Sequence, residues 1–210
     1  MLSLAYYVVY CICDVATLTI ISIPYGYEVG AITGDARNGT IIDNCSVTGG
    51  QIIVTGGGYA GGLVGRVYGK PEVVITDCTV TGTYTKTSGN YSGGLVGYFS
   101  GSGSSKNKSV ENSYSSGKVT GTGTTEYGAF NGRSGVEYRG TNYYDAERAS
   151  VARAYGTSGA PIGLAVAYPQ GKTTADMMKQ STFEGWDFIT VWSMADNETY
   201  PFFYAFWDVP

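Results

Sequence analysis

The pentapeptide GGLVG occurs twice in this sequence, at residues 61–65 and again at residues 93–97. The first copy overlaps GGGYAG at residues 56–61, which has the G-x-G-x-x-G spacing of a dinucleotide-binding loop. A dinucleotide site needs a helix next, because the amides at the helix N-terminus contact the pyrophosphate. The residues that follow, GLVGRVYGKP, contain four further Gly or Pro and have no helical period. We therefore expect no cofactor at these glycines.

The glycine motif belongs to a longer repeat. Weaker copies, GAITG and GAFNG, occur at residues 30–34 and 128–132, and the first glycines of the four copies are Gly30, Gly61, Gly93 and Gly128. A second marker precedes each copy: CDV at Cys13, CSV at Cys45, CTV at Cys78 and SYS at Ser113. Because both markers keep a spacing of about 32 residues, the sequence predicts four repeats, a pattern typical of stacked architectures.

The composition favours short strands separated by turns. Apolar residues make up 43% of the chain, and Tyr, Thr, Val, Ile and Gly dominate it. Each repeat has one strand-like run around its marker, a second between the marker and the glycine motif, and a third within the glycine motif. We predict an all-β parallel β-helix (β-solenoid) of about four coils with three strands per coil. Residues 1–145 form the four repeats, and residues 146–210 form a C-terminal capping segment of the same domain.

The stacked repeats predict a continuous core and a ladder of cysteines. Equivalent positions of the glycine motif place Leu63 and Leu95 inward, together with Ile32 and Phe130 of the weaker copies. Cys45 and Cys78 either form a ladder of small buried side chains or a disulfide. Strands about 4.8 Å apart bring their Cα atoms within reach of a disulfide, but the parallel Cβ vectors strain it.

Both ends of the chain are apolar. Residues 2–23 lack a basic n-region and contain Asp14, so we interpret them as the first coil rather than as a signal peptide or a membrane span. Residues 173–181 are the best helix candidate, with Thr173 or Thr174 as N-cap. We expect this helix, followed by Trp186, Phe188 and Trp192, to cover the open end of the column.

The repeats resemble a known family. GGLVG, preceded by a strand such as NCSVTG at residues 44–49, resembles the GLUG-motif repeat of large bacterial surface and adhesin-like proteins. The segment at residues 173–203 also resembles the one that follows such repeats, through Met178, STF at 181–183, GWDF at 185–188, Val191–Trp192 and Tyr200–Pro201. The resemblance covers nearly the whole chain and implies a secreted or cell-surface protein. It supplies no active site, because the family is defined by its scaffold.

The sequence offers little to catalysis. The absence of histidine excludes Ser-His-Asp and Cys-His catalysis and every His-containing metal site. The alternative is a carbohydrate-active β-helix enzyme, a polysaccharide lyase or glycosidase, with Asp43, Asp77 and Glu111 as stacked carboxylates. Asp43 and Glu111 lie two residues before the marker but Asp77 only one, so regular strands would point them to opposite faces. We therefore expect no enzyme and no catalytic, metal or cofactor site.

The expected role is that of an extracellular structural protein of a cell surface, matrix or filament, with adhesion as a second role. The net charge of −4 opposes nucleic-acid binding. Partners are further copies of the chain, as a homopolymer, and cell-surface glycans or matrix components. The candidates for end-to-end assembly are Tyr6, Tyr7, Val8, Val9, Phe202, Phe203, Phe206 and Trp207, although the C-terminal aromatics could instead fold back as a cap. The glycosylation candidates are Asn38, Asn44, Asn90, Asn107 and Asn197, each of which begins N-x-S/T.

Overall fold

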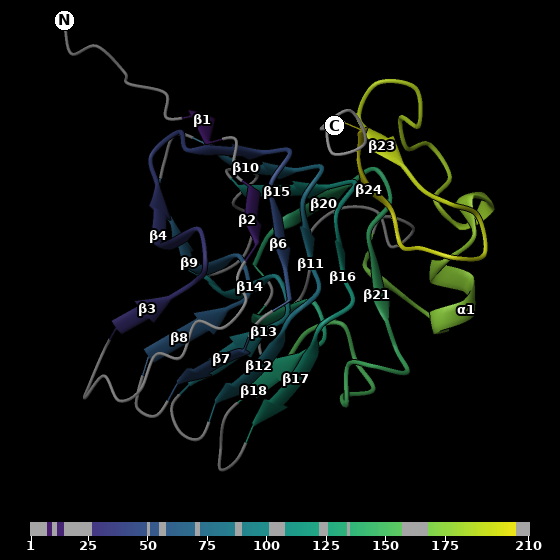
Figure 1. The fold of residues 1–210 in the computed structure, drawn as a ribbon. Coiled ribbons are helices and arrows are strands. Elements are labelled where there is room, and N and C mark those ends of the chain that lie inside the picture. Colours follow the sequence, from purple (N-terminus) through teal and green to yellow (C-terminus); the bar gives the residue numbers. More distant parts are fainter. Residues whose placement is uncertain are drawn as a thin grey trace, which may run out of the picture.

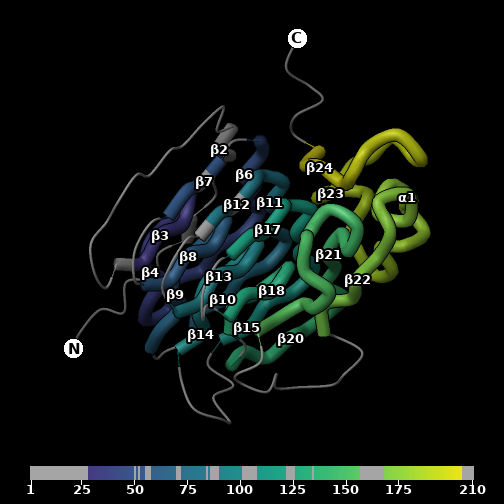
Figure 2. The backbone as a smooth tube through the Cα atoms, turned by 90° about the horizontal axis from the view of Figure 1, so that it is seen from below, coloured from purple at the N-terminus to yellow at the C-terminus, as the bar shows by residue number. Residues whose placement is uncertain are grey.

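The protein is a parallel β-solenoid, which confirms the predicted fold class (Figure 1). A computed structural model describes residues 8–9, 12–14, 27–49, 51–54, 58–69, 72–86, 90–100, 108–121, 126–133, 135–156 and 168–204. The coils follow one another along a single axis, so strands that are one repeat apart in sequence lie side by side (Figure 2).

Each complete coil gives one strand to each of five parallel sheets, whereas the sequence analysis predicted three strands per coil. The first sheet contains β1 (Val8–Val9), β5 (Ile41–Asp43), β10 (Val73–Thr76), β15 (Lys108–Glu111) and β20 (Glu137–Arg139). The second contains β2 (Ile12–Asp14), β6 (Ser46–Thr48), β11 (Thr79–Val80), β16 (Tyr114–Ser115), β21 (Tyr143–Asp145) and β22 (Gln170–Lys172). Asn44, Asp77 and Asn112 adopt the left-handed conformation between these two sheets and bend the chain there.

The other three sheets surround the glycine motifs. The third contains β7 (Gln51–Val54), β12 (Thr83–Lys86) and β17 (Lys118–Gly121). The fourth contains β3 (Tyr27–Val29), β8 (Gly58–Gly61), β13 (Tyr91–Gly93) and β18 (Glu126–Gly128). The fifth contains β4 (Thr33–Arg37), β9 (Val64–Tyr68), β14 (Val96–Phe99) and β19 (Asn131–Arg133). The motif thus joins the fourth sheet to the fifth in each of these coils.

The glycine motifs superpose coil on coil. The strand register pairs Gly61 with Gly93, and the next pair joins Gly93 to Gly128. The amide of Leu63 donates to the carbonyl of Leu95 at 2.9 Å, and the amide of Leu95 donates to that of Phe130 at 2.7 Å. Leu63, Leu95 and Phe130 are fully buried in the column, and Ile32 packs against the same core while partly exposed.

The register of the first coil corrects the assignment of Cys13 to the marker ladder. Strand β2 pairs Cys13 with Val47, whereas Cys45 is level with Cys78 one coil further on. The marker position of the first coil is therefore residue 11, which lies outside the described residues. Residues 11 and 13 are both cysteines, and positions two apart in a strand share a face, so the sequence pattern alone could not decide which of them is the marker.

The coil path continues past residue 145, where the sequence analysis placed the start of the cap. The amide of Val119 donates to the carbonyl of Ala149 at 3.1 Å, and the amide of Phe130 donates to that of Ala154 at 2.8 Å. Tyr155 then forms a parallel bridge with Asn131. Residues 149–156 therefore add part of a further coil to the column.

The cap begins with a helix that is shorter than predicted. The elements of the cap are α1 (Thr174–Met177), the 3-10 helix η2 (Gln180–Thr182), β23 (Trp192–Ser193) and β24 (Phe202–Phe203). Thr173 is the N-cap, and its hydroxyl accepts from the amide of Asp176 at 3.0 Å. The helix ends at Met177, because Met178 leaves the helical conformation and Lys179 is extended. The carbonyl of Met178 accepts from the amide of Asn197.

The cap packs on the flank of the solenoid, which corrects the expectation that it covers the open end (Figure 1). Its aromatic cluster lies against Tyr114 and Tyr143, which are in register on β16 and β21. The cap contributes Met177, Phe183, Trp186, Trp192 and Phe203 to this cluster. The expectation failed because the sequence does not reveal that Tyr114 and Tyr143 lie on the outer face of their strands. Aromatic rings on that face bury their apolar surface by packing against the cap.

Candidate functional site

The glycine motif is a tight corner whose tip lies in the core. A Cβ atom at Gly61 would lie 2.1 Å from the carbonyl oxygen of Val64, and one at Gly65 would lie 2.4 Å from the amide nitrogen of Val29. Real Cβ contacts are never this short, so these glycines are needed because two backbone segments meet. Leu63 and Val64 between them are buried. The motif is therefore a structural corner that fixes how each coil folds into the column.

The marker positions form a ladder of buried polar atoms. Cys45 and Cys78 are buried and form no disulfide, and in the next coils Ser113 and Asn142 occupy the same place. The Cys78 thiol donates to the carbonyl of Thr76 at 3.1 Å, and the amide of Cys78 donates to the Ser113 hydroxyl at 3.1 Å. The ladder therefore joins each coil to its neighbour without a disulfide in this structure.

We expect these thiols to be inert in the folded protein. Burial raises the pKa of the Cys78 thiol, and only the thiolate is an effective nucleophile. Iodoacetamide should therefore leave Cys45 and Cys78 unmodified until the protein is unfolded in urea, when both should react. Peptide mass spectrometry measures each site separately. Modification of either thiol at equal rates with and without urea would contradict the ladder.

The three acids do not form a stack of carboxylates. The register aligns both Asp43 and Glu111 with Thr76, one residue away from Asp77. One carboxylate oxygen of Asp77 accepts from the indole nitrogen of Trp192 at 3.1 Å, and the other accepts from the Thr76 hydroxyl at 3.0 Å. Burial raises the pKa of Asp77. Asp77 is thus an anchor for the cap, a role that the sequence analysis missed.

A row of tyrosines and arginines lies on the two sheets that flank the glycine corner. Tyr59 and Tyr91 lie on β8 and β13, and Arg66, Tyr98 and Arg133 lie on β9, β14 and β19. The sequence analysis missed this row. Their spacing in the sequence could have revealed it. Tyr59 and Tyr91 lie two positions before the first glycine of their motifs, and Arg66, Tyr98 and Arg133 lie five positions after it.

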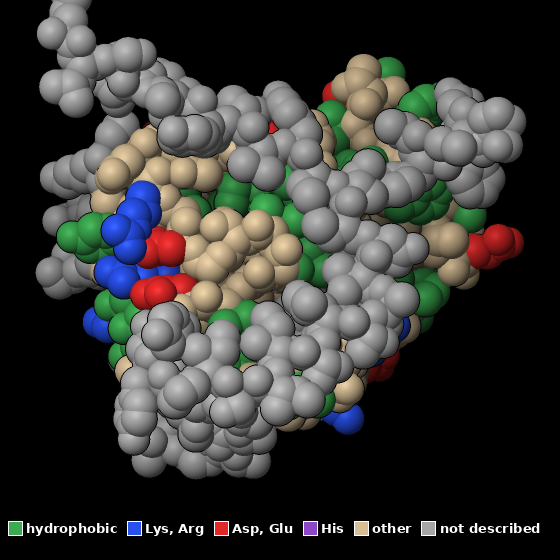
Figure 3. Space-filling view, turned by 60° about the vertical axis from the view of Figure 1, so that its left-hand side comes forward, with side chains coloured by type: hydrophobic (Ala, Val, Ile, Leu, Met, Phe, Trp, Pro, Cys, Tyr) green, Lys and Arg blue, Asp and Glu red, His purple; other side chains and the backbone are tan. Residues whose placement is uncertain are grey.

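Charged groups extend this row on the side of the first coils. Arg66 forms an ion pair with Glu28 at 2.9 Å, and Arg37 pairs with Asp35. The space-filling view shows basic and acidic side chains gathered side by side on this face (Figure 3). The charges therefore neutralise one another, and they do not create a field of one sign.

The glycosylation candidates lie in different settings. Asn38, Asn90 and Asn197 are exposed. Asn44 is only partly exposed, because it occupies the left-handed corner that precedes Cys45. Asn107 lies outside the described residues. The first three are therefore the better placed to carry a glycan.

The self-assembly candidates are partly used within the chain itself. Val8 and Val9 pair through their backbone with Ile41 and Ile42 of the next coil. Phe203 is buried in the cap with its ring 4.8 Å from that of Trp192, and Phe202 beside it is partly buried. Tyr6, Tyr7, Phe206 and Trp207 lie outside the described residues.

Asp145, at the end of β21, ties the cap to the second sheet. One carboxylate oxygen accepts from the amides of Glu147 and Arg148 at 2.9 and 3.0 Å. The other accepts from the hydroxyl of Thr174 at 2.7 Å and from that of Tyr200. The pKa of Tyr200 is raised to about 12, first because burial disfavours the phenolate and second because its hydroxyl donates to this carboxylate.

We expect this contact to fail at high pH. Tyrosine ionises near pH 10 in the unfolded chain, whereas folded Tyr200 keeps its proton to about pH 12. Its contribution to stability is therefore complete below pH 10 and is lost as the pH rises to about 12. Urea denaturation should show the stability difference between the wild type and Tyr200→Phe shrinking over this range. A difference that stays constant would contradict the assignment.

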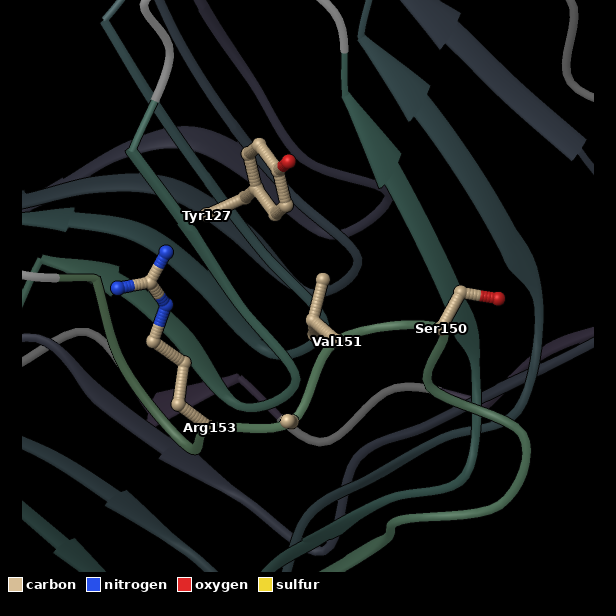
Figure 4. Close-up of a pocket in the computed structure, with 5 residues that line it drawn as sticks. Tyr127, Ser150, Val151 and Arg153 are labelled. Atoms are coloured by element: carbon tan, nitrogen blue, oxygen red, sulfur yellow. The ribbon is translucent and has the colours of Figure 1, made fainter.

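The described surface also has a shallow pocket of about 420 Å³, lined by Tyr127, Ser150, Val151, Ala152 and Arg153 (Figure 4). The side chains of Val151 and Arg153 point in the direction of Tyr127, and the Ser150 hydroxyl points away from it. This lining supplies a guanidinium, a phenol and a hydroxyl, whereas glycoside hydrolysis uses a pair of carboxylates. We assign the pocket no role. Among the described residues, no group of three or more Cys, Asp or Glu could hold a metal ion.

The fold and its repeated corner define a parallel β-solenoid built from glycine-motif repeats. The family model of the GLUG motif matches residues 56–85, which include the first GGLVG and the marker at Cys78. The chain therefore contains a GLUG motif, a motif found in extracellular and cell-surface proteins. No curated protein and no solved structure matches the chain. In the described part of the chain, no helix has the length and hydropathy needed to cross a membrane.

Proposed function

We propose that the chain is a non-enzymatic structural protein of a cell surface, extracellular matrix or filament, and that it assembles end to end. Binding to cell-surface glycans or matrix components is a second role within this proposal. The main observation behind this proposal is that the repeated positions make contacts between coils. The glycine corner, the Cys45–Cys78 ladder and the tyrosine and arginine row all join one coil to the next. Repetition of this kind supports a scaffold.

The edges of the first coil support end-to-end assembly. In the part of the chain that the structure describes, β3 and β4 are the last strands of their sheets at the N-terminal end. Such an edge offers backbone donors and acceptors to a further strand. The aromatic segment AFW at residues 205–207 follows the cap directly. A contact between this segment of one copy and the first coil of the next is heterologous and propagates as a filament.

A truncation tests this assembly. A chain that ends at Tyr204 keeps β24, and with it Phe203 in the cap, but lacks residues 205–210. We expect the full chain to form concentration-dependent polymers in sedimentation velocity and electron microscopy, and the truncated chain to remain monomeric with unchanged circular dichroism. Phe203→Ala is the control for cap damage and should lower stability instead. A full chain that stays monomeric at all concentrations would contradict the proposal.

The enzyme alternative has its own assay. Neutral and acidic polysaccharides incubated with the protein should yield neither new reducing ends nor unsaturated uronic acids. Turnover that disappears in Asp43→Asn or Glu111→Gln would instead establish a carbohydrate-active enzyme. Asp77→Ala would be a poor probe of catalysis, because it removes the oxygen that accepts the hydrogen bond from Trp192 of the cap.

A further inference from the structure

Three tyrosines form a continuous ring stack on the surface of two neighbouring coils. The three rings lie side by side in pairs, with the ring centroid of Tyr98 4.4 Å from that of Tyr59 and 5.0 Å from that of Tyr91. The planes differ by 25° and 10°. Tyr59 and Tyr91 are themselves in register, with centroids 5.7 Å apart. Nearly parallel rings at these distances are offset, so ring carbons of neighbouring residues are in van der Waals contact.

The surroundings hold this stack in place. The guanidinium carbon of Arg66 lies 6.0 Å from the ring centroid of Tyr59, and that of Arg133 lies 5.6 Å from Tyr91 and 5.4 Å from Tyr98. Arg133 also donates to the Tyr98 hydroxyl at 3.3 Å. The two guanidinium groups attract the rings, and the parallel strands fix the backbone spacing. The rings therefore stay close without any rearrangement of the fold.

The stack can also exchange electrons and protons with the surroundings, because all three tyrosines are only partly buried. A second tyrosine pair, at the interface between the cap and the solenoid, serves as a comparison. Tyr114 and Tyr200 stack with centroids 6.0 Å apart at 10°, but Tyr114 is buried. The hydroxyl of Tyr114 donates to the carbonyl of Pro201 at 2.7 Å, and that of Tyr200 donates to the Asp145 carboxylate. The hydroxyl protons of Tyr114 and Tyr200 are therefore held in hydrogen bonds within the protein.

We propose that the Tyr59–Tyr98–Tyr91 stack is an oxidative cross-linking site, at which a haem peroxidase with hydrogen peroxide joins Tyr98 to Tyr59 or Tyr91 as dityrosine. Each of two phenols loses one electron to the oxidant and one proton to water. The two radicals pair to form one carbon–carbon bond between ortho positions, and the hydrogens on those carbons return to the oxygens. One peroxide takes up the two electrons and two protons and leaves as two waters.

The two bonds have different consequences. A Tyr59–Tyr98 bond joins β8 of one coil to β14 of the next, whereas a Tyr91–Tyr98 bond joins two strands of one coil. The first is a covalent staple across the hydrogen-bonded interface between coils. It restricts the unfolded chain, as any such link does, and should raise the unfolding temperature. This inference does not depend on end-to-end assembly.

The test is peroxidase oxidation of the folded, full-length chain at low protein concentration. Trypsin cuts after Arg66 and Lys86, which separates Tyr59 from Tyr98 but leaves Tyr91 and Tyr98 in one peptide. We expect dityrosine fluorescence, a linked pair of peptides that contain Tyr59 and Tyr98, and a single peptide lighter by two hydrogens. The yield should not depend on protein concentration, because the bonds are intramolecular.

Two variants and oxidation in urea are the controls for this test. Tyr98→Phe keeps the ring but removes the shared phenol, so both bonds should be lost while circular dichroism is unchanged. Tyr68→Phe removes an exposed tyrosine beside Arg66 and should leave the yield unchanged. Oxidation of the wild type in urea should abolish the specific links. Absence of dityrosine, equal yield in Tyr98→Phe, or links between different chains only would overturn the proposal.

Discussion

Replacement of Gly61 by alanine should strongly destabilise the fold. The added Cβ would lie 2.1 Å from the carbonyl oxygen of Val64 and 2.6 Å from the amide nitrogen of Gly97 in the next coil. Both atoms belong to the backbone, so no side chain can move aside, and the corner would have to open in two coils. We expect a loss above about 4 kcal/mol, which is exceptional for one methyl group. Urea denaturation followed by circular dichroism measures it.

Ala31→Gly is the matched control for this substitution. Ala31 lies in the weaker motif of the first coil, at the position after its first glycine, and the variant removes one carbon where Gly61→Ala adds one. We expect it to cost about 1 kcal/mol or less, mainly through the flexibility of glycine. If Gly61→Ala were as mild as this control, the corner geometry described for residues 61–65 would be wrong.

Trp192→Ala should produce the second large effect, by detaching the cap from the flank of the solenoid. Trp192 is fully buried, and its ring centroid lies 4.6 Å from that of Trp186 and 4.8 Å from that of Phe203. Removal of a buried aromatic ring of this kind costs about 3–5 kcal/mol. The expected results are a lower urea midpoint and faster proteolysis within residues 168–204.

Asp77→Asn and Asp77→Ala separate the hydrogen bond from the packing. Asparagine keeps an oxygen for the indole N–H, and Asn44 and Asn112 occupy the same left-handed corner in the neighbouring coils. We therefore expect Asp77→Asn to change stability by less than about 1 kcal/mol. Asp77→Ala leaves the buried indole N–H without its acceptor and should cost about 1–3 kcal/mol. Equal effects of the two variants would mean that the Trp192–Asp77 hydrogen bond contributes nothing.

The fold class followed from the sequence because repetition constrains a solenoid strongly. The spacing of Gly30, Gly61, Gly93 and Gly128 sets the coil length, and stacking leaves one register in which all four corners coincide. The first coil shows the limit of this reasoning. Residues 11 and 13 are both cysteines, and only backbone pairing with β6 reveals that Cys13 lies opposite Val47.

Contacts between segments that are distant in the chain could not be predicted from the sequence. Asp77 and Trp192 lie 115 residues apart, and no local pattern indicates that the cap returns to the third coil. The cap's true support, the outward Tyr114 and Tyr143, also depends on which face each residue takes in a two- or three-residue strand. Such strands are too short for alternation to decide the face.

Backbone nuclear Overhauser effects measured on isotopically labelled protein would test the stacked register most directly. The structure predicts contacts of a parallel sheet between Val64 and Val96 and between Thr79 and Tyr114, because these pairs lie in adjacent coils. Strands of one sheet are about 4.8 Å apart, which is within range of the measurement. Antiparallel contacts of Val64 or Thr79, or contacts of Val64 with strand residues that are not one repeat away, would contradict the solenoid and every proposal built on it.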